Sequence, residues 1–166
     1  MNITFIGMSG VGKSTIGRKL ASDFGYKFID IDKIIENKEG INLQTILDKM
    51  GDSEFIKLEE QSVLGLSFVK NTIISPGGSI IYSDRALNYL KSISTIIYLG
   101  VSLKEIEKRL SSSKKLRGIV GLKHKTLTEL YNERVPLYEK YADIQIDVTD
   151  KNLDIVIQEI KSRIGI

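Results

Sequence analysis

The stretch FIGMSGVGKST, residues Phe5–Thr15, decides how this chain folds. It joins an apolar run that begins at Ile3 to an amphipathic segment, and it fits the pattern G-x-x-x-x-G-K-[ST] from Gly7 to Ser14. Glycines let successive backbone N–H groups converge on one anion without obstruction by a Cβ. A helix that begins near Lys13 adds free N–H groups and the positive end of its dipole. A strand, this loop and a helix in that order predict a site for the phosphates of a nucleoside triphosphate.

The positions of this loop have separate predicted tasks. Lys13 supplies a point charge for the β- and γ-phosphates, and the Ser14 hydroxyl is offered to Mg²⁺. A guanine-nucleotide switch is not favoured, because the stretch 37–40 ends in Gly where a guanine-reading Asp is needed, and it precedes the D-x-x-G match at 48–51. The nucleotide-binding residues that we expect are Gly10, Val11, Gly12, Lys13, Ser14 and Thr15.

The composition fits one cytoplasmic α/β domain. With 166 residues, of which 42% are hydrophobic, the chain is long enough for one buried core. It has no cysteine, which excludes disulfides and thiolate chemistry, and its single histidine, His124, excludes a histidine-rich metal site. A net charge of +3 is too small to indicate a nucleic-acid partner. No apolar run approaches the roughly 20 residues of a membrane span, and no signal peptide is expected.

Apolar runs and amphipathic segments alternate along the chain. Continuously apolar runs predict strands buried on both faces, and their alternation with helices predicts a doubly wound sheet of parallel strands. Two S/T-x-x-E patterns, at Ser102–Glu105 and Thr126–Glu129, predict capping boxes that open helices. We expect strands near 3–6, 28–29, 72–74, 95–99 and 144–148, and helices over 13–24, 31–47 in two parts, 52–69, 84–91, from 102, 126–141 and 152–164.

A second group of polar residues follows the second expected strand. The sequence DID, residues 30–32, lies at the carboxyl end of that strand, where open α/β sheets bind their ligands. One carboxylate suits a Mg²⁺ ion held through water, and the other suits the proton of an acceptor hydroxyl. The polar and basic stretch 111–118 interrupts the alternation, and we expect a surface segment there.

A set of motifs runs in a fixed order along nearly the whole chain: Gly7–Thr15 with Gly17 and Leu20-Ala21, Asp30-x-Asp32, Gly51-x-x-x-Phe55-x-x-x-Glu59, Pro76-Gly77-Gly78, Arg117 and Arg134-x-Pro136-x-Tyr138. Together these motifs resemble the shikimate kinases. The resemblance implies a three-layer P-loop kinase fold of the nucleoside-monophosphate-kinase type, with a five-stranded parallel sheet flanked by helices and a lid. It implies one kinase domain over 1–166, with a substrate-binding helical region at about 32–60 and the lid at about 111–124.

The same resemblance implies transfer of the γ-phosphoryl group of ATP to the 3-hydroxyl of shikimate, in aromatic amino acid biosynthesis. The enzyme would be a cytoplasmic monomer with no nucleic-acid or membrane partner. Lys13, Asp32 and Arg117 would be catalytic, with Asp32 as the base for the acceptor hydroxyl and Arg117 closing from the lid onto the phosphates. Ser14 and Asp30 would hold Mg²⁺, Asp30 through a bound water.

Three positions depart from the family's pattern at the acceptor. Ile56 stands where the family's F-R-x-x-E motif has an arginine for the substrate carboxylate, and the adjacent cation, Lys57, is turned by about 100° on a helix. Ser79 replaces a third glycine, and Gly118 replaces a proline in the lid. The substrate-binding residues that we expect are Asp32, Lys57, Gly77, Gly78, Ser79 and Arg134.

Two other functions are compatible with these residues. One is a kinase of the same fold that acts on another hydroxy acid, a sugar acid or an amino acid, which Ile56 favours. The other is a nucleotide-binding regulatory module without turnover, which has no need of a base at Asp32. Glu59 is expected to steady Arg134 or Lys57 in place of the missing arginine.

Overall fold

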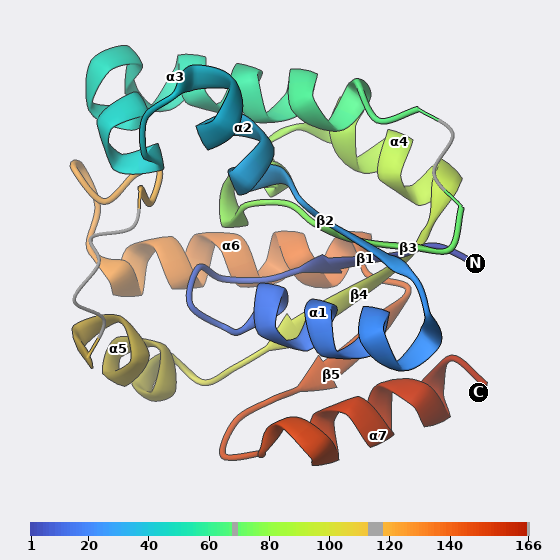
Figure 1. Ribbon diagram of the computed structural model, residues 1–166. Coiled ribbons are helices and arrows are strands. Elements are labelled where there is room, and N and C mark those ends of the chain that lie inside the picture. The colour runs from blue at the N-terminus through green and yellow to red at the C-terminus, as the bar shows by residue number, and fades with distance from the viewer. Residues whose placement is uncertain (68–69, 113–117, 166) are drawn as a thin grey trace.

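The computed structural model describes residues 1–67, 70–112 and 118–165. Within these residues, five parallel strands form one sheet in the order β2-β3-β1-β4-β5, and helices cover both of its faces (Figure 1). The predicted five-stranded parallel sheet is therefore confirmed. The strands are β1 (Ile3–Ile6), β2 (Lys27–Asp30), β3 (Thr72–Ser75), β4 (Thr95–Gly100) and β5 (Ile144–Asp147).

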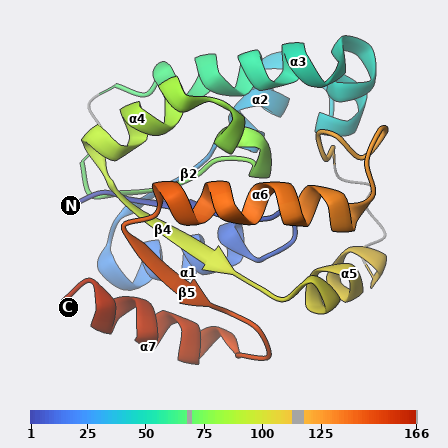
Figure 2. The same cartoon turned by 180° about the vertical axis from the view of Figure 1, so that it is seen from behind.

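The helices form a layer on each side of the sheet. Helix α1 lies in front of the sheet in Figure 1, and α6 lies in front of it when the molecule is turned around in Figure 2. Helix α7 packs beside α1, and α4 shares the other face with α6. The helices are α1 (Lys13–Phe24), α2 (Ile31–Glu39), α3 (Leu43–Leu64), α4 (Asp84–Ile93), α5 (Leu103–Ser112), α6 (Leu127–Tyr141) and α7 (Leu153–Arg163), and a 3₁₀ helix, η1, spans Gly78–Tyr82.

The core lies where the apolar strands meet these helices. All four residues of β1 and of β3 are buried, which explains why these strands read as continuous runs instead of alternating ones. Because the strands are parallel, their carboxyl ends share one edge of the sheet, and the loops after β1, β2 and β3 meet there. None of the helices in the described part of the chain is both long and apolar enough to cross a bilayer.

Helix α3 differs from the expected pair of segments. It continues from Leu43 through a kink at Gly51, where φ is 79°, and it ends at Leu64 instead of the expected Val69. The C-cap is Gly65, a residue of low helix propensity, whose N–H makes the last helical bond to the Gln61 carbonyl. Val69 itself lies outside the described residues.

The two predicted capping boxes have different outcomes. At α6, the Thr126 hydroxyl accepts from the Glu129 N–H, and the Glu129 carboxylate accepts from the Thr126 N–H, as predicted. At α5, Ser102 accepts from the Glu105 N–H at 3.3 Å. The Glu105 carboxylate bonds to Arg109 instead of returning to the cap, because an arginine one turn later offers a charged donor.

Candidate active site

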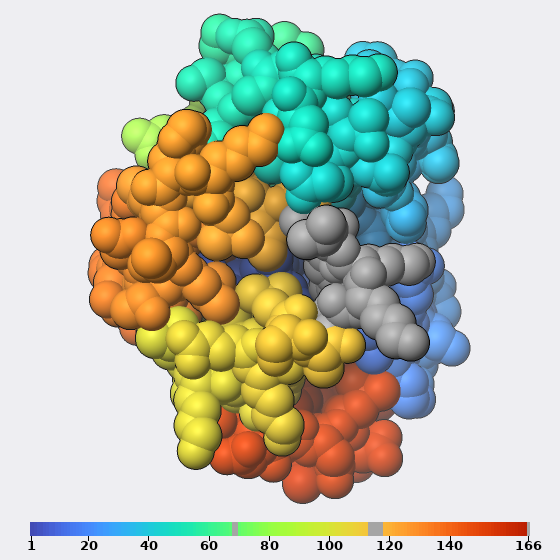
Figure 3. Space-filling view, turned by 90° about the vertical axis from the view of Figure 1, so that its left-hand side faces the viewer, coloured from blue at the N-terminus to red at the C-terminus, as the bar shows by residue number. Residues whose placement is uncertain are grey.

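A cleft of about 1220 Å³ opens at the carboxyl edge of the sheet. It is bounded by the loop after β1, the first turn of α2 and the first turn of α3. Figure 3 looks onto this side of the molecule, where the surface is hollowed between the yellow residues of α5 and the orange residues that precede and begin α6. The cleft therefore lies where the strand order predicts a ligand site, since β1 pairs with β3 on one side and with β4 on the other.

The loop after β1 has the backbone that its glycines predict. Gly10 has φ of 86° and Gly12 has φ of 108°, both in the left-handed region that side chains disfavour. Gly12 is the N-cap of α1, so the free N–H groups of the first helical turn face the cleft. A loop of this shape at a helix N-terminus is a site for anions such as phosphate.

Lys13 is buried beside this loop. Its Nζ donates to the carbonyl oxygens of Gly7 at 2.8 Å and Met8 at 3.1 Å, so the ammonium is curled against its own loop. Burial lowers the pKa of Lys13 to about 8, although the nearby Asp32 and Glu59 carboxylates act in the opposite direction. The charge is thus fixed at the site where phosphate oxygens are expected.

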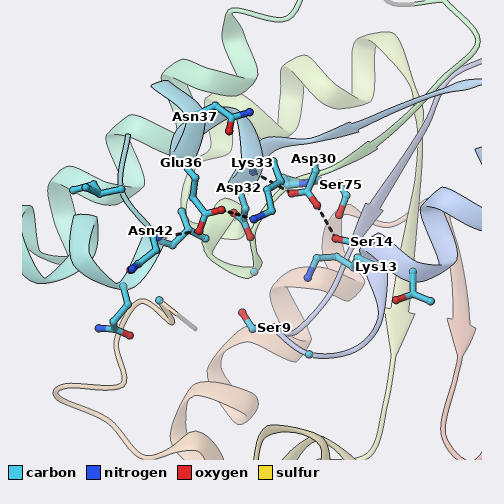
Figure 4. A pocket seen from close by; sticks show the side chains of 18 of the residues that line it. Ser9, Lys13, Ser14, Asp30, Asp32, Lys33, Glu36, Asn37, Asn42 and Ser75 are labelled. Atoms are coloured by element: carbon cyan, nitrogen blue, oxygen red, sulfur yellow. Dashed lines mark hydrogen bonds and ion pairs between the residues drawn. The ribbon is translucent and has the colours of Figure 1, made fainter. Parts of the chain in front are cut away.

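Ser14 and Asp30 form a pair of oxygen ligands at the same end of the cleft. The Ser14 hydroxyl donates to Asp30 Oδ2 at 2.9 Å, as the dashed line in Figure 4 shows, and Asp30 also caps α2 by accepting from the Lys33 N–H. Oxygen ligands of this kind suit Mg²⁺, which usually takes one or two carboxylates and completes its shell with water and phosphate. No group of three or more acidic, His or Cys residues in the described ranges gathers into a separate metal site.

Asp32 lies in the first turn of α2 and faces the opening that Lys13 faces in Figure 4. Burial raises the pKa of its carboxyl to about 6, while Lys13 opposes this effect. A carboxylate that takes up a proton near neutral pH has the property required of a general base. Its neighbour is the backbone of Gly77, where a Cβ would lie 2.9 Å from Asp32 Oδ1.

Glu59 is fully buried and lies against the same glycine, where a Cβ would be 2.5 Å from its Oε1. The Ser79 hydroxyl donates to its Oε2 at 2.6 Å, whereas its Oε1 has no hydrogen-bond partner among the described residues. Burial raises the pKa of Glu59 to about 7, and the charge of Asp32 adds to the effect. Ser79 therefore supplies the hydrogen bond to this carboxyl, in place of the expected pairing of Glu59 with Arg134 or Lys57.

Arg134, on α6, is a fully buried cation. Its Nε donates to the Tyr82 hydroxyl at 3.2 Å and its Nη2 to the Val120 carbonyl at 2.6 Å. None of the ion pairs within the described ranges includes it. Its Nη1 lies 3.3 Å from the position that a Cβ of Gly78 would take, and Gly78 lines the cleft. A buried guanidinium without an acidic partner is suited to an incoming anion.

The remaining predicted residues divide between cleft, interior and surface. Lys57 is a correction: its exposed side chain pairs with Glu54 at 2.7 Å on the outer face of α3 and does not line the cleft, while Ile56 packs against the core. Arg117 lies outside the described residues, as does the middle of the expected lid. The predicted residues that line the cleft are Gly10, Gly12, Lys13, Ser14, Thr15, Asp30, Asp32 and Gly78. Gly77, Ser79 and Arg134 are buried behind it.

A smaller pocket of about 190 Å³ adjoins the other side of the phosphate loop. It is lined by Val11, by the end of α5 and by the β5–α7 connection, and Arg109 Nη1 donates to the Val11 carbonyl at 2.8 Å. Arg109 is not among the residues predicted for the site. A cation in the last turn of a helix also stabilises the helix dipole, so its sequence position alone did not single it out.

Comparisons with known proteins agree on one family. The family model described as shikimate kinase matches residues 9–165. A curated relative, the shikimate kinase of Caldanaerobacter subterraneus subsp. tengcongensis, is 34% identical over 161 residues, which cover 96% of this chain and 93% of that protein.

Solved structures agree with the sequence matches. The shikimate kinase of Aquifex aeolicus superposes with a TM-score of 0.84 at 30% identity, over 99% of this chain and 96% of that one. The shikimate kinase of Acinetobacter baumannii, solved in complex with shikimate, gives a TM-score of 0.84 at 27% identity, over 99% and 93% of the two chains. These matches extend beyond the phosphate loop to the parts of the chain that line the rest of the cleft.

Proposed function

The chain belongs to the shikimate kinase family, and we propose from this premise that it transfers the γ-phosphoryl group of ATP to the 3-hydroxyl of shikimate. The observation that carries the proposal concerns two consecutive glycines. Gly77 lies against the Asp32 carboxylate, and Gly78 lies against the Arg134 guanidinium. A base and an anion-binding group thus lie against two adjacent glycines. This arrangement suits a small acceptor that has both a hydroxyl and a carboxylate.

In the proposed reaction, the loop residues Gly10–Thr15 bind the triphosphate and Asp32 acts on the acceptor. Asp32 takes the proton of the acceptor hydroxyl while the hydroxyl oxygen bonds to the γ-phosphorus. ADP leaves with the electrons of the broken P–O bond. Lys13 offsets the negative charge of the transferred phosphoryl group, because its buried ammonium is held next to the phosphate loop. The bridging oxygen thus leaves on ADP, and the acceptor becomes a phosphate ester.

We also propose Ser14 and Asp30 as the residues that hold Mg²⁺ with the nucleotide. The hydroxyl–carboxylate pair at 2.9 Å supports this assignment, because both groups are hard oxygen ligands at the phosphate end of the cleft. When bound, the ion supplies charge that stabilises the phosphates. A kinase that consumes ATP works where ATP is supplied, so we propose a cytoplasmic location. A single domain over 1–166 and a monomeric state stay predictions.

This chain places few cations where the carboxylate of the acceptor is expected to bind. Ile56 packs against the core and Lys57 pairs with Glu54, which leaves Arg134 as the buried guanidinium at this end of the cleft. This observation favours one alternative, a kinase of the same fold whose acceptor is another small hydroxy acid. The two functions differ in acceptor and share the nucleotide chemistry.

The test is a coupled assay of ADP release with shikimate and a panel of other hydroxy acids, sugar acids and nucleoside monophosphates. We expect shikimate to raise the rate far above the ATPase background. Asp32→Asn should lower kcat by at least about 100-fold, because the amide cannot take the proton, with little change in the affinity for ATP. Asp23→Asn, at the end of α1 in an ion pair with Lys161 of α7 and away from the cleft, is the matched control and should leave kcat unchanged.

Two outcomes would contradict the proposal. Background rates with shikimate, together with turnover of another acceptor, would favour the alternative. Undiminished turnover by the Asp32→Asn variant would show that Asp32 is not the base, and it would leave the family membership intact.

A further inference from the structure

Tyr82, the last residue of η1, contacts the buried arginine and has no part in the proposed reaction. Its hydroxyl accepts from Arg134 Nε at 3.2 Å, and the guanidinium carbon of Arg134 lies 5.3 Å from the centre of its ring. One side chain thus contacts the guanidinium twice, through its hydroxyl at Nε and through its ring. Two contacts from one side chain restrict the orientation in which an arginine presents its remaining donors.

The direction of the Tyr82 hydroxyl is set from outside the cleft. The hydroxyl donates to Glu133 Oε1 at 2.5 Å, and Glu133 is itself paired with Lys125. Because the hydroxyl hydrogen is committed to this carboxylate, the oxygen lone pairs face Arg134 Nε. Burial and the hydrogen bond to Glu133 raise the pKa of Tyr82, so the phenol stays protonated and keeps this orientation at neutral pH.

The remaining contacts of Arg134 leave its Nη1 edge toward Gly78, which lines the cleft. Nη2 is bonded to the Val120 carbonyl, and Nη1 lies beside Gly78, whose missing side chain would stand 3.3 Å away. Arg134 is the one buried guanidinium among the described residues, and it has no ion pair there that could fix its orientation instead. Its aim toward the cleft therefore depends on neutral partners, which are the Val120 carbonyl, the Tyr138 hydroxyl and Tyr82, and of these Tyr82 makes two contacts.

We propose that Tyr82 is a positioning residue that holds Arg134 with its Nη1 edge toward the carboxylate of the acceptor, and so sets the preference for acidic acceptors. This inference rests on the proposed function. It adds a residue outside the phosphate loop and outside the acidic pair, and it connects substrate selection to the Lys125–Glu133 pair near the surface.

The experiment compares Tyr82→Phe with wild type on shikimate and on its methyl ester. The variant keeps the ring and loses the hydroxyl bond to a charged group, so the KM for shikimate should rise about five- to tenfold. The kcat and the KM for ATP should change less than about twofold, because neither depends on the Nη1 edge. The preference for the acid over the ester, as a ratio of kcat/KM values, should fall by the same five- to tenfold.

Tyr131→Phe is the matched control. Tyr131 is also half-buried, and its hydroxyl donates to the Val101 carbonyl at 2.8 Å, away from Arg134. This variant should leave the acid-to-ester ratio unchanged. Glu133→Gln is the second test, since it leaves Tyr82 intact and weakens the acceptor that orients its hydroxyl, and the ratio should fall about two- to threefold. If Tyr82→Phe does not fold, the Glu133→Gln ratio decides the question.

The outcomes separate this inference from the function on which it rests. Wild-type enzyme that does not phosphorylate shikimate overturns the proposed function, and this inference with it. Active wild type, combined with an unchanged acid-to-ester ratio in both variants, overturns the inference alone. Equal losses on acid and ester also overturn it, because they indicate damaged packing and not a lost orientation of Arg134.

Discussion

Glu59 is the residue at which burial and charge conflict most directly. Its side chain has no exposure, one of its oxygens accepts from Ser79, and the other has no partner among the described residues. Ionisation there adds a charge next to Asp32 in a medium that solvates charge poorly. A proton on the unpartnered oxygen removes this cost, which accounts for a pKa raised from 4.5 to about 7.

The raised pKa of Glu59 predicts a pH-dependent stability. Between about pH 4.5 and 7 the folded protein binds this proton more tightly than the unfolded chain, so this contribution to stability is lost as pH rises through that window. Glu59→Gln is neutral at every pH. Relative to wild type, its unfolding free energy should therefore rise by up to about 3 kcal/mol between pH 5 and pH 8.

Urea unfolding followed by far-UV circular dichroism at both pH values measures this difference. The pKa of Asp32 is also raised, but Asp32 is present in both proteins, so its effect largely cancels. Glu54→Gln, at an exposed position on the same helix, is the control and should show little difference between the two pH values. A constant difference between wild type and Glu59→Gln at pH 5 and pH 8 would contradict the assignment.

At the scale of the element, α6 brings Arg134 and Tyr138 to the back of the cleft. The Tyr138 hydroxyl donates to the Gly78 carbonyl at 2.5 Å, so this helix also supports the glycine against which Arg134 lies. The helix begins at a complete capping box, and the segment that precedes it provides the Val120 carbonyl to Arg134. Its first turn therefore contributes to the position of the anion-binding group.

We expect Thr126→Ala to lower the unfolding free energy by about 1 kcal/mol, because it removes the hydroxyl that satisfies the Glu129 N–H. Thr128→Ala lies two residues later in the same exposed turn and makes the same chemical change without loss of a cap. It should cost less than half as much. Urea unfolding of the two variants checks this, and equal losses would show that the cap contributes nothing beyond helix propensity.

At the scale of the whole molecule, the proposed function assigns the two substrates to separate ends of the cleft. The phosphate loop and α1 form one end, while α2, the first turn of α3 and Gly78 of η1 form the other. Ligands that bind only the folded state raise its stability, by about 2.7 kcal/mol at 100 times the dissociation constant. For a chain of this size that corresponds to a rise in Tm of roughly 5–10 °C.

Lys13→Ala should therefore remove most of the Tm shift caused by Mg²⁺ and ADP and leave the shift caused by shikimate. Thermal unfolding with each ligand alone measures both shifts against the variant's own baseline. Lys19→Ala, on the exposed face of the same helix and paired with Asp23, should keep both shifts. Loss of the shikimate shift in Lys13→Ala would show that the two ends of the cleft are not independent.

The features that the sequence by itself determined are formed by residues that lie close together along the chain. The phosphate loop was predictable because its glycines, its lysine and the first turn of α1 are neighbours in sequence, and local backbone conformation dictates the rest. The same holds for the strands, for the Thr126 capping box and for Asp30 and Asp32, which follow a strand directly. These features depend on residue type and short-range spacing.

The tertiary structure alone decided which distant residues meet. The bond from Ser79 to Glu59 spans 20 positions, and the bond from Arg134 to Tyr82 spans 52, so each depends on how α3, η1 and α6 pack around the sheet. Lys57 does not line the cleft for the same reason, because Ile56 packs against the core and the next residue on the helix faces solvent. Pattern and spacing fix local conformation, whereas the pairing of buried polar groups is settled by the packing of whole elements against one another.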